Sequence, residues 1–203
     1  MTARKWVVAH RGDHSQAPEN TVAAFDAAIH AGADMIEFDV HRLPGGTLVV
    51  CHDEPSAGAD VPRLADVLRL CAGRIRLDIE LKNFTCEDDV LAALAEAGVD
   101  PDDCIVTSFD AAQLARIRRA HPALRTGLLT EGLPERCEDA FLAPHYANLT
   151  IERLAEYEAR GIPLLPWTVN GNADLERLLA APAVAGVITD RVREALEARG
   201  RLK

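Results

Sequence analysis

Short segments rich in β-forming residues alternate with segments of helical periodicity about eight times along this chain of 203 residues. Such an alternation favours a parallel sheet covered by helices. Strands are expected at residues 5–10, 35–40, 47–52, 75–81, 104–109, 125–130, 145–149, 162–169 and 186–190. Helices are expected at residues 20–32, 62–73, 87–98, 110–120, 150–161 and 172–180.

The number of repeats favours a closed (β/α)₈ TIM barrel of the α/β class over an open doubly wound sheet, with residues 1–203 forming one domain. The chain is shorter than the ~250 residues typical of such barrels, so its loops must be short. One connection breaks the pattern, because "HRLPGG" (41–46) is too short for a helix. We therefore expect residues 35–40 and 47–52 to pair as a hairpin.

The segment "MIEFDV" (35–40) carries two acidic residues in strict alternation with apolar ones. Alternate side chains of a strand share a face, so Glu37 and Asp39 point away from the apolar side chains between them. If that apolar face packs under the helices of a barrel, the two carboxylates point inward and need a counter-charge. On a solvated hairpin, the same pattern would mean only that the acids face water.

The same alternation returns in "RLDIELK" (76–82), where Asp78, Glu80 and Lys82 share one face. Glu80 would add a third inward carboxylate near the carboxyl end of its strand, the end at which barrel enzymes hold their catalytic groups. Three such acids are typical of a metal site. An ion pair between Glu80 and Lys82 is the simpler alternative.

Two histidines, His10 and His52, end other expected strands, and Arg11 follows the first of them. Taken alone, each is equally well explained by a surface or hydrogen-bonded side chain. In the expected barrel, however, all of them lie at the same end as the inward acids. The convergence of two imidazoles, three carboxylates and two cations indicates an active site.

Composition narrows the class of protein. The chain is 48% hydrophobic, and neither a signal peptide nor an apolar run long enough to span a bilayer is apparent, so a cytoplasmic location is expected. A net charge of −10 argues against nucleic-acid partners and stable membrane association, although a small anionic substrate can still bind at a local cationic site. The five cysteines contain no C-x-x-C pair, so small buried thiols are expected rather than disulfides or a zinc site.

The chain also resembles the glycerophosphodiester phosphodiesterase family. The resemblance rests on segments that occur in the family's order and span nearly the whole chain. They are "AHRGDHSQAPENTVAAF" (9–25), "GADMIEFDVHR" (32–42), "TLVVCHDE" (47–54), "LDIELK" (77–82), "WTVN" (167–170) and "GVITDR" (186–191).

This resemblance implies the TIM barrel and hydrolysis of small-molecule glycerophosphodiesters to glycerol 3-phosphate and an alcohol. It implies one divalent cation, Mg²⁺ or Ca²⁺, held by Glu37, Asp39 and Glu80. His10 and His52 would be the general acid and base, and Arg11 and Lys82 would hold phosphate oxygens. Trp167 would form a wall of the substrate pocket.

Three further residues of these motifs are given structural roles. Asn170 is interpreted as a cap of the next helix, with positioning of the substrate as the alternative. Glu19 and Asn20 are interpreted as residues that order the first loop and the start of the first helix, with Asn20 as its N-cap.

One departure from the family concerns the connection after "HDE", where only "PSAGAD" (55–60) stands in place of a longer insertion found in many relatives. We expect this shorter connection to leave the substrate pocket more open. The family's usual specificity for glycerophosphodiesters is therefore not assumed for this chain. Two alternatives remain open at this point: a lyase of the sphingomyelinase D type, which gives a cyclic phosphate, and a non-catalytic binding module. The sequence does not fix the head group, the order in which the histidines act, or the oligomeric state.

Overall fold

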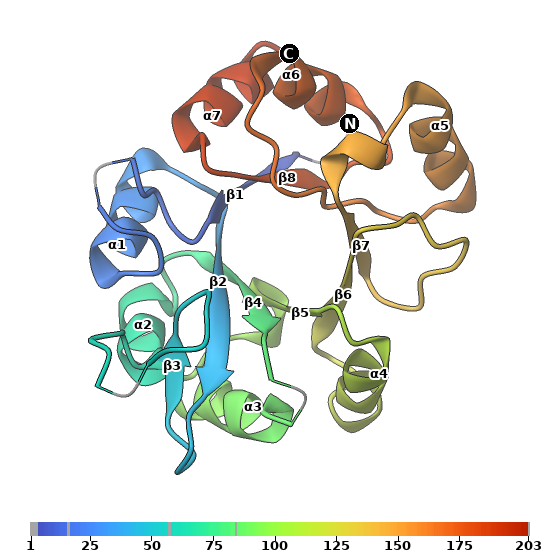
Figure 1. Cartoon of the computed structure of the whole chain (residues 1–203). Coiled ribbons are helices and arrows are strands. Elements are labelled where there is room, and N and C mark those ends of the chain that lie inside the picture. Colours follow the sequence, from blue (N-terminus) through green and yellow to red (C-terminus); the bar gives the residue numbers. More distant parts are fainter. Residues whose placement is uncertain (1–3, 16, 57, 84, 203) are drawn as a thin grey trace.

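Parallel strands form a ring that helices surround (Figure 1). The computed structural model describes residues 4–15, 17–56, 58–83 and 85–202. The strands are β1 (Trp6–His10), β2 (Met35–Arg42), β3 (Leu48–Val50), β4 (Arg76–Leu81), β5 (Cys104–Ser108), β6 (Arg125–Thr130), β7 (Phe141–Pro144) and β8 (Gly186–Thr189). The helices are α1 (Val22–Ala31), α2 (Leu64–Cys71), α3 (Glu87–Glu96), α4 (Ala111–Ala120), α5 (Ile151–Arg160), α6 (Asn172–Ala180) and α7 (Val192–Gly200).

Seven of these strands form one curled parallel sheet in the order β7-β6-β5-β4-β2-β1-β8. The remaining strand, β3, pairs antiparallel with β2 outside this path, which confirms the expected hairpin. The register places His10 of β1 beside Glu37 of β2, and Asp39 of β2 beside Glu80 of β4. Side chains that are far apart in the sequence therefore meet at the carboxyl end of the sheet.

Residues 163–169 connect the two outer strands of this sheet. On one side the Leu165 amide donates to the Leu142 carbonyl of β7 at 2.9 Å; on the other, the Val169 amide donates to the Ile188 carbonyl of β8, also at 2.9 Å. The segment contains Pro163 and Pro166, which have no amide hydrogen, so it cannot form a regular ladder on either side. The expected (β/α)₈ barrel is confirmed, with this irregular segment taking the place of a strand between β7 and β8.

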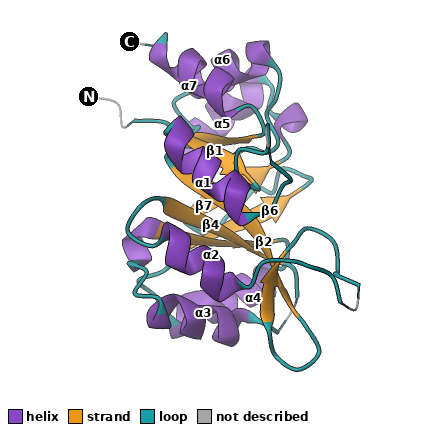
Figure 2. Ribbon diagram, turned by 90° about the vertical axis from the view of Figure 1, so that its left-hand side faces the viewer, coloured by secondary structure: helices purple, strands orange, loops and turns teal. Residues whose placement is uncertain are grey.

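The two faces of the strands pack as their alternation predicted. Phe38 of β2 packs outward, with its ring 5.6 Å from that of Phe25 on α1. Inward-facing Val8, Met35 and Ile105 belong to a separate apolar cluster inside the barrel. Figure 2 shows helices on the outside of the strands. The interior is therefore apolar in its middle and leaves its polar groups to the carboxyl end.

Local signals fix several helix ends. Asp110 and Thr150 accept backbone hydrogen bonds at the starts of α4 and α5, as helix caps do. At the start of α1 the capping residue is Thr21 rather than the expected Asn20. Among the described residues, no helix has the length and apolar character needed to cross a membrane.

Residues 162–169, expected to be a strand, form only isolated bridges, and two further elements differ from expectation. The strand expected at residues 145–149 is wrong, because β7 ends at Pro144 and residues 146–148 form a 3₁₀ turn. The sequence of β7, "FLAP", is buried throughout and so shows no alternation. Helix α7 was not expected, because two of its three buried side chains are alanines, Ala195 and Ala198, and small residues give a weak periodic signal.

A tight turn follows β1 and leads the chain back over the end of the barrel. Arg11 and Gly12 both have positive φ, at 56° and 87°. A Cβ atom on Gly12 would lie 2.7 Å from the carbonyl carbon of Ala24 in α1. Only glycine allows both this conformation and this approach of the two backbones.

The turn gives a test of the packing between β1 and α1. We expect Gly12→Ala to lower the free energy of unfolding by about 1–2 kcal/mol for its left-handed conformation and by a further ~1–3 kcal/mol for the clash with Ala24. Gly32→Ala is the matched control, because Gly32 has a φ of 85° with open space around it. Urea denaturation of both variants measures the difference. Equal losses would contradict the proposed steric contact.

Candidate active site

A cavity of about 270 Å³ opens at the carboxyl ends of the strands. Seven of the eight site residues predicted from the sequence line it: His10, Arg11, Glu37, His52, Glu80, Lys82 and Trp167. The eighth, Asp39, is 1% exposed and lies behind them, in contact with Lys82 and Arg11. The structure therefore brings together all the residues that the sequence predicted.

Three buried carboxylates lie close together in the site. Glu37, Asp39 and Glu80 each offer an oxygen atom, and these atoms lie within 4.8 Å of one another. The group exists because Glu37 and Asp39 are alternate residues of β2, while β4 carries Glu80 in register with Asp39. Three negative charges this close need compensating positive charge.

Two basic side chains supply part of that charge. The Lys82 ammonium lies 2.9 Å from Asp39 Oδ1 and 2.7 Å from Glu80 Oε1. The Arg11 guanidinium lies 3.3 Å from Asp39 Oδ2 through Nε and 2.8 Å from Glu19 Oε1 through Nη1. Both basic side chains therefore contact Asp39, the most buried of the three acids.

A neutral partner completes the surroundings of Asp39. Asn20 donates a hydrogen bond of 2.8 Å from its amide nitrogen to Asp39 Oδ2. Asn20 is itself buried and has a positive φ of 55°. The interpretation that Asn20 orders the first loop was therefore incomplete, because this side chain reaches the carboxylate group directly.

The pKa values of the acids reflect this competition between repulsion and compensation. Burial, with repulsion from Asp39 and Glu80, raises the pKa of Glu37 well above its usual range. Burial and the nearby Asp39 raise the pKa of Glu80 to about 7, although Lys82 opposes them. For Asp39 burial acts in the same direction, but Lys82 and the hydrogen bond from Asn20 outweigh it and lower its pKa.

A fourth acid, Asp78, lines the cavity below these three. It is fully buried, and Thr107 donates a hydrogen bond of 2.9 Å to its Oδ1 atom. Among the described residues, its Oδ2 atom has no hydrogen-bond partner. Burial raises the pKa of Asp78 to about 7, so its proton is held near neutrality. The alternation placed Asp78 on the inward face but gave it no role.

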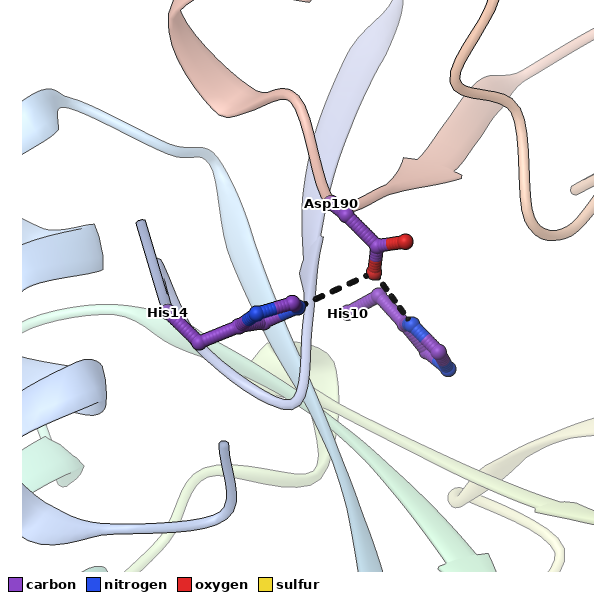
Figure 3. Close-up of side chains that lie close together, drawn as sticks. All are labelled: His10, His14 and Asp190. Carbon is purple, nitrogen blue, oxygen red and sulfur yellow. Dashed lines mark hydrogen bonds and ion pairs between the residues drawn. The ribbon is translucent and has the colours of Figure 1, made fainter. Parts of the chain in front are cut away.

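His10 belongs to a hydrogen-bonded network that the sequence did not reveal. Its Nδ1 lies 2.6 Å from Asp190 Oδ1, and His14 Nε2 lies 3.1 Å from the same oxygen (Figure 3). Asn170 fixes the other carboxylate oxygen by donating from Nδ2 at 2.6 Å, and its Oδ1 accepts from the Asp190 amide at 2.9 Å. Although burial opposes it, hydrogen bonding to His10, Asn170 and His14 lowers the pKa of Asp190.

This network corrects the interpretation of Asn170 as a helix cap. Gly171 occupies the N-cap position of α6, and no side chain there bonds the helix backbone. In the sequence, the signal for this network was Asp190, which belongs to the motif "GVITDR". Its partner His10 lies 180 positions earlier in the chain, and only closure of the barrel between β1 and β8 brings the two together.

His52 lines the cavity and is held from two sides. Its Nδ1 lies 2.9 Å from Asp53 Oδ1, and its carbonyl accepts a hydrogen bond of 3.0 Å from His41 Nε2. The His52 ring is 42% exposed and Asp53 93% exposed, so this pair is far more open to water than His10 and Asp190.

Aromatic side chains form another part of the wall. Trp167 donates from Nε1 to the Ala143 carbonyl at 2.7 Å, which fixes the indole plane. The rings of Phe109 and His145 meet it edge-on, at 5.8 and 5.3 Å between centroids. Phe109 lines the cavity beside Trp167 and is 50% exposed, so it stands at the open mouth.

The donor set formed by Glu37, Asp39 and Glu80 fits a hard divalent cation. It consists entirely of carboxylate oxygens, which Mg²⁺ and Ca²⁺ prefer. Lys82 contacts two of the three acids, so the structure already holds positive charge at this place. These three residues could therefore bind a metal ion.

Comparison with known proteins gives a consistent result. The family model described as "Glycerophosphoryl diester phosphodiesterase family" matches residues 10–88 and 61–194. A glycerophosphodiester phosphodiesterase of Caldanaerobacter subterraneus is 32% identical over 228 aligned positions, which cover 91% of this chain and 93% of that protein. Because this chain has only 203 residues, that relative carries segments that are absent here.

Solved structures share the fold over nearly the whole chain. A glycerophosphodiester phosphodiesterase from Parabacteroides distasonis has a TM-score of 0.86 at 20% identity and covers 100% of both chains. A phosphodiesterase from Oleispira antarctica, in complex with the product sn-glycerol-3-phosphate, has a TM-score of 0.83 at 22% identity. It covers 95% of this chain and 96% of that one.

The raised pKa of Glu80 predicts a pH-dependent stability in the presence of a chelator. The folded protein keeps this proton up to pH about 7, whereas an unfolded chain releases it near 4.5, so folding is increasingly disfavoured as the pH rises between these values. We expect the free energy of unfolding of the wild type, relative to Glu80→Gln, to fall by roughly 3 kcal/mol or less across this window. Urea denaturation measures it.

Glu96→Gln serves as the control for this experiment, because Glu96 lies exposed at the end of α3. Its stability should follow that of the wild type at every pH. Parallel curves for the wild type and Glu80→Gln would contradict the raised pKa.

Proposed function

The chain belongs to the glycerophosphoryl diester phosphodiesterase family, and from this premise we propose that it hydrolyses glycerophosphodiesters to glycerol 3-phosphate and an alcohol. In this proposal one divalent cation binds Glu37, Asp39 and Glu80, and His10 and His52 exchange protons with the substrate. The expectation that the chain is a phosphodiesterase of this family is confirmed.

One observation carries the proposed mechanism. Two imidazoles line one cavity together with two basic side chains and the acids Glu37 and Glu80, and the third acid of the group, Asp39, lies directly behind them. A phosphodiester needs this set, because its anionic oxygens repel a nucleophile and its leaving alkoxide needs a proton. The product seen in the Oleispira antarctica enzyme supports glycerol 3-phosphate as the product here.

The bound cation would supply electrostatic stabilisation of the charge that grows on the phosphoryl oxygens. The chain itself would add Arg11 and Lys82. Arg11 can hold two oxygens with its planar fork, whereas Lys82 acts as a compact charge. Both now lie against carboxylates, so a cation on those carboxylates would free Lys82 to face the substrate.

We assign the role of base to His10. Asp190 accepts the Nδ1 proton of His10, which leaves Nε2 with the lone pair that can take a proton from the attacking hydroxyl. Asp190 also stabilises the imidazolium that results. His52 would then donate a proton to the leaving alkoxide. Its more exposed position allows it to be reprotonated from water.

The walls of the cavity suit a substrate that binds with one end inside the cavity and the other end in solvent. Trp167 and Phe109 offer flat apolar surface beside the catalytic groups. Residues 55–60, of which Ala57 lies outside the described residues, form only a short connection after β3. With so little chain over the mouth, we propose that the glycerol phosphate portion binds within the cavity and that the alcohol portion extends toward solvent.

The deciding experiment measures glycerol 3-phosphate released from glycerophosphocholine and glycerophosphoethanolamine with Mg²⁺, with Ca²⁺ and with a chelator. Metal-dependent release of linear product would support the whole proposal. Accumulation of a cyclic phosphate would instead indicate lyase chemistry. Substrate affinity without turnover would indicate a binding module.

The two histidines give the first mutational test. We expect His10→Ala and His52→Ala each to lower kcat by about 10²–10⁴-fold, the contribution typical of general acid–base catalysis, with little change in thermal stability. His30→Ala, at an exposed position on α1, is the control and should keep the wild-type rate. A near-normal rate for His10→Ala would remove His10 from the mechanism.

The group of Glu37, Asp39 and Glu80 gives the second mutational test. Glu37→Gln keeps the size of the side chain but removes one charged ligand, so we expect metal affinity to fall at least about 100-fold and hydrolysis to fall with it. Isothermal titration with Mg²⁺ or Ca²⁺ measures the affinity without relying on turnover. Unchanged binding by Glu37→Gln would place the ion elsewhere.

A further inference from the structure

One carboxylate oxygen is shared by two imidazoles at the edge of the active site. Asp190 Oδ1 lies 2.6 Å from His10 Nδ1 and 3.1 Å from His14 Nε2 (Figure 3). The His10, His14 and Asp190 side chains are 18%, 26% and 27% exposed, so a small solute can reach all three. The mechanism above uses His10 and Asp190 but gives no task to His14.

The chain fixes these three groups before any ligand binds. Asn170 holds Asp190 Oδ2 at 2.6 Å and so turns Oδ1 toward the rings. His14 lies in the turn after β1, between two residues that are themselves anchored. The Asp13 amide donates to the Ala24 carbonyl at 2.9 Å, and the Ser15 amide donates to Asp13 Oδ1 at 3.3 Å. The position of His14 is therefore set by the backbone.

We propose that His10 Nδ1, His14 Nε2 and Asp190 Oδ1 bind one transition-metal ion of the Zn²⁺ class. Two imidazole nitrogens and one carboxylate oxygen are a donor set that such ions prefer, in contrast to the all-oxygen group of Glu37, Asp39 and Glu80. The three ligand atoms lie within 4.8 Å of one another. Ligands of a tetrahedral zinc ion lie roughly 3.3 Å apart, so shifts of less than about 1 Å complete the site.

Binding of the ion changes which nitrogen of each ring carries the proton. A carboxylate only accepts, so the hydrogen bonds to Asp190 place protons on His10 Nδ1 and His14 Nε2. A metal ion needs the lone pairs of those same atoms. Each neutral ring therefore gives up that proton to solvent and takes one up at its other nitrogen, with no net release. A ring that is already an imidazolium releases one proton.

The consequence for catalysis follows from this exchange and rests on the proposed function. With the ion on Nδ1, His10 carries its proton on Nε2 and cannot accept another from the nucleophile. Zinc bound at this site therefore inhibits hydrolysis, even when the carboxylate group holds its own hard cation. Binding itself does not depend on the proposed activity.

Binding is tested on the full chain with millimolar Mg²⁺ present to occupy the carboxylate group. Zn²⁺ is titrated by calorimetry, and Co²⁺ by its visible absorption. We expect one site per chain, weakened at least about 100-fold in both His14→Ala and His14→Asn, since removal of a ligand costs no less than loss of a residue that orients one. His30→Ala and Glu37→Gln should bind as the wild type does. Equal zinc affinity with and without His14, or no binding at micromolar zinc, overturns the proposal.

Inhibition is tested as the ratio of the hydrolysis rates of each variant with and without micromolar Zn²⁺. The wild type and His30→Ala should lose most of their rate, and His14→Ala and His14→Asn should lose little. Equal inhibition with and without His14 overturns the catalytic consequence. If no diester is hydrolysed at all, the proposed function fails, and the binding titration still decides whether the metal site exists.

Discussion

Repulsion among buried acids is the constraint on which the rest of this structure depends. Glu37, Asp39, Asp78 and Glu80 all face the inside of a barrel whose middle is apolar. Carboxylates in such a place either keep their protons or gain positive partners. The group does both, since burial and repulsion raise the pKa values of three members while Lys82 and Asn20 keep Asp39 ionised.

The backbone around the acids is shaped to deliver those partners. Arg11 and Asn20 both adopt positive φ, which side-chain-bearing residues rarely do. Each stands at one end of the loop between β1 and α1, and each directs a side chain at Asp39. Such conformations cost on the order of 1–3 kcal/mol each and persist because tertiary contacts hold them. The strained backbone therefore lies beside the buried carboxylates, where compensating positive charge and hydrogen bonds are needed.

Local patterns in the sequence predicted the parts of the site that depend on local geometry. The inward direction of Glu37, Asp39 and Glu80 follows from the alternation of a strand, and their meeting follows from parallel strands sharing one carboxyl end. The partners of His10 could not be found in this way. The residue that lies next to the end of a strand depends on the order of the strands in the sheet. Asp190 follows β8, which reaches β1 only when the first and last strands pair.

Other misses have the same origin. His14 lies in a turn, where no period marks a direction. Asn170 was interpreted through the helix that follows it, whereas its partner is in the next strand connection. Residues 162–169 were expected to form a strand; the segment does bridge β7 and β8, but its two prolines break the ladder on both sides.

The pairing of β1 with β8 has a consequence for the synthesis of this protein. During synthesis, Asp190 follows His10 by 180 residues. Until then β1 lacks one neighbouring strand and His10 lacks its hydrogen-bond acceptor. At 5–20 residues per second, the delay is about 10–40 s. In a nascent chain the candidate site therefore stays unfinished until translation has passed residue 190.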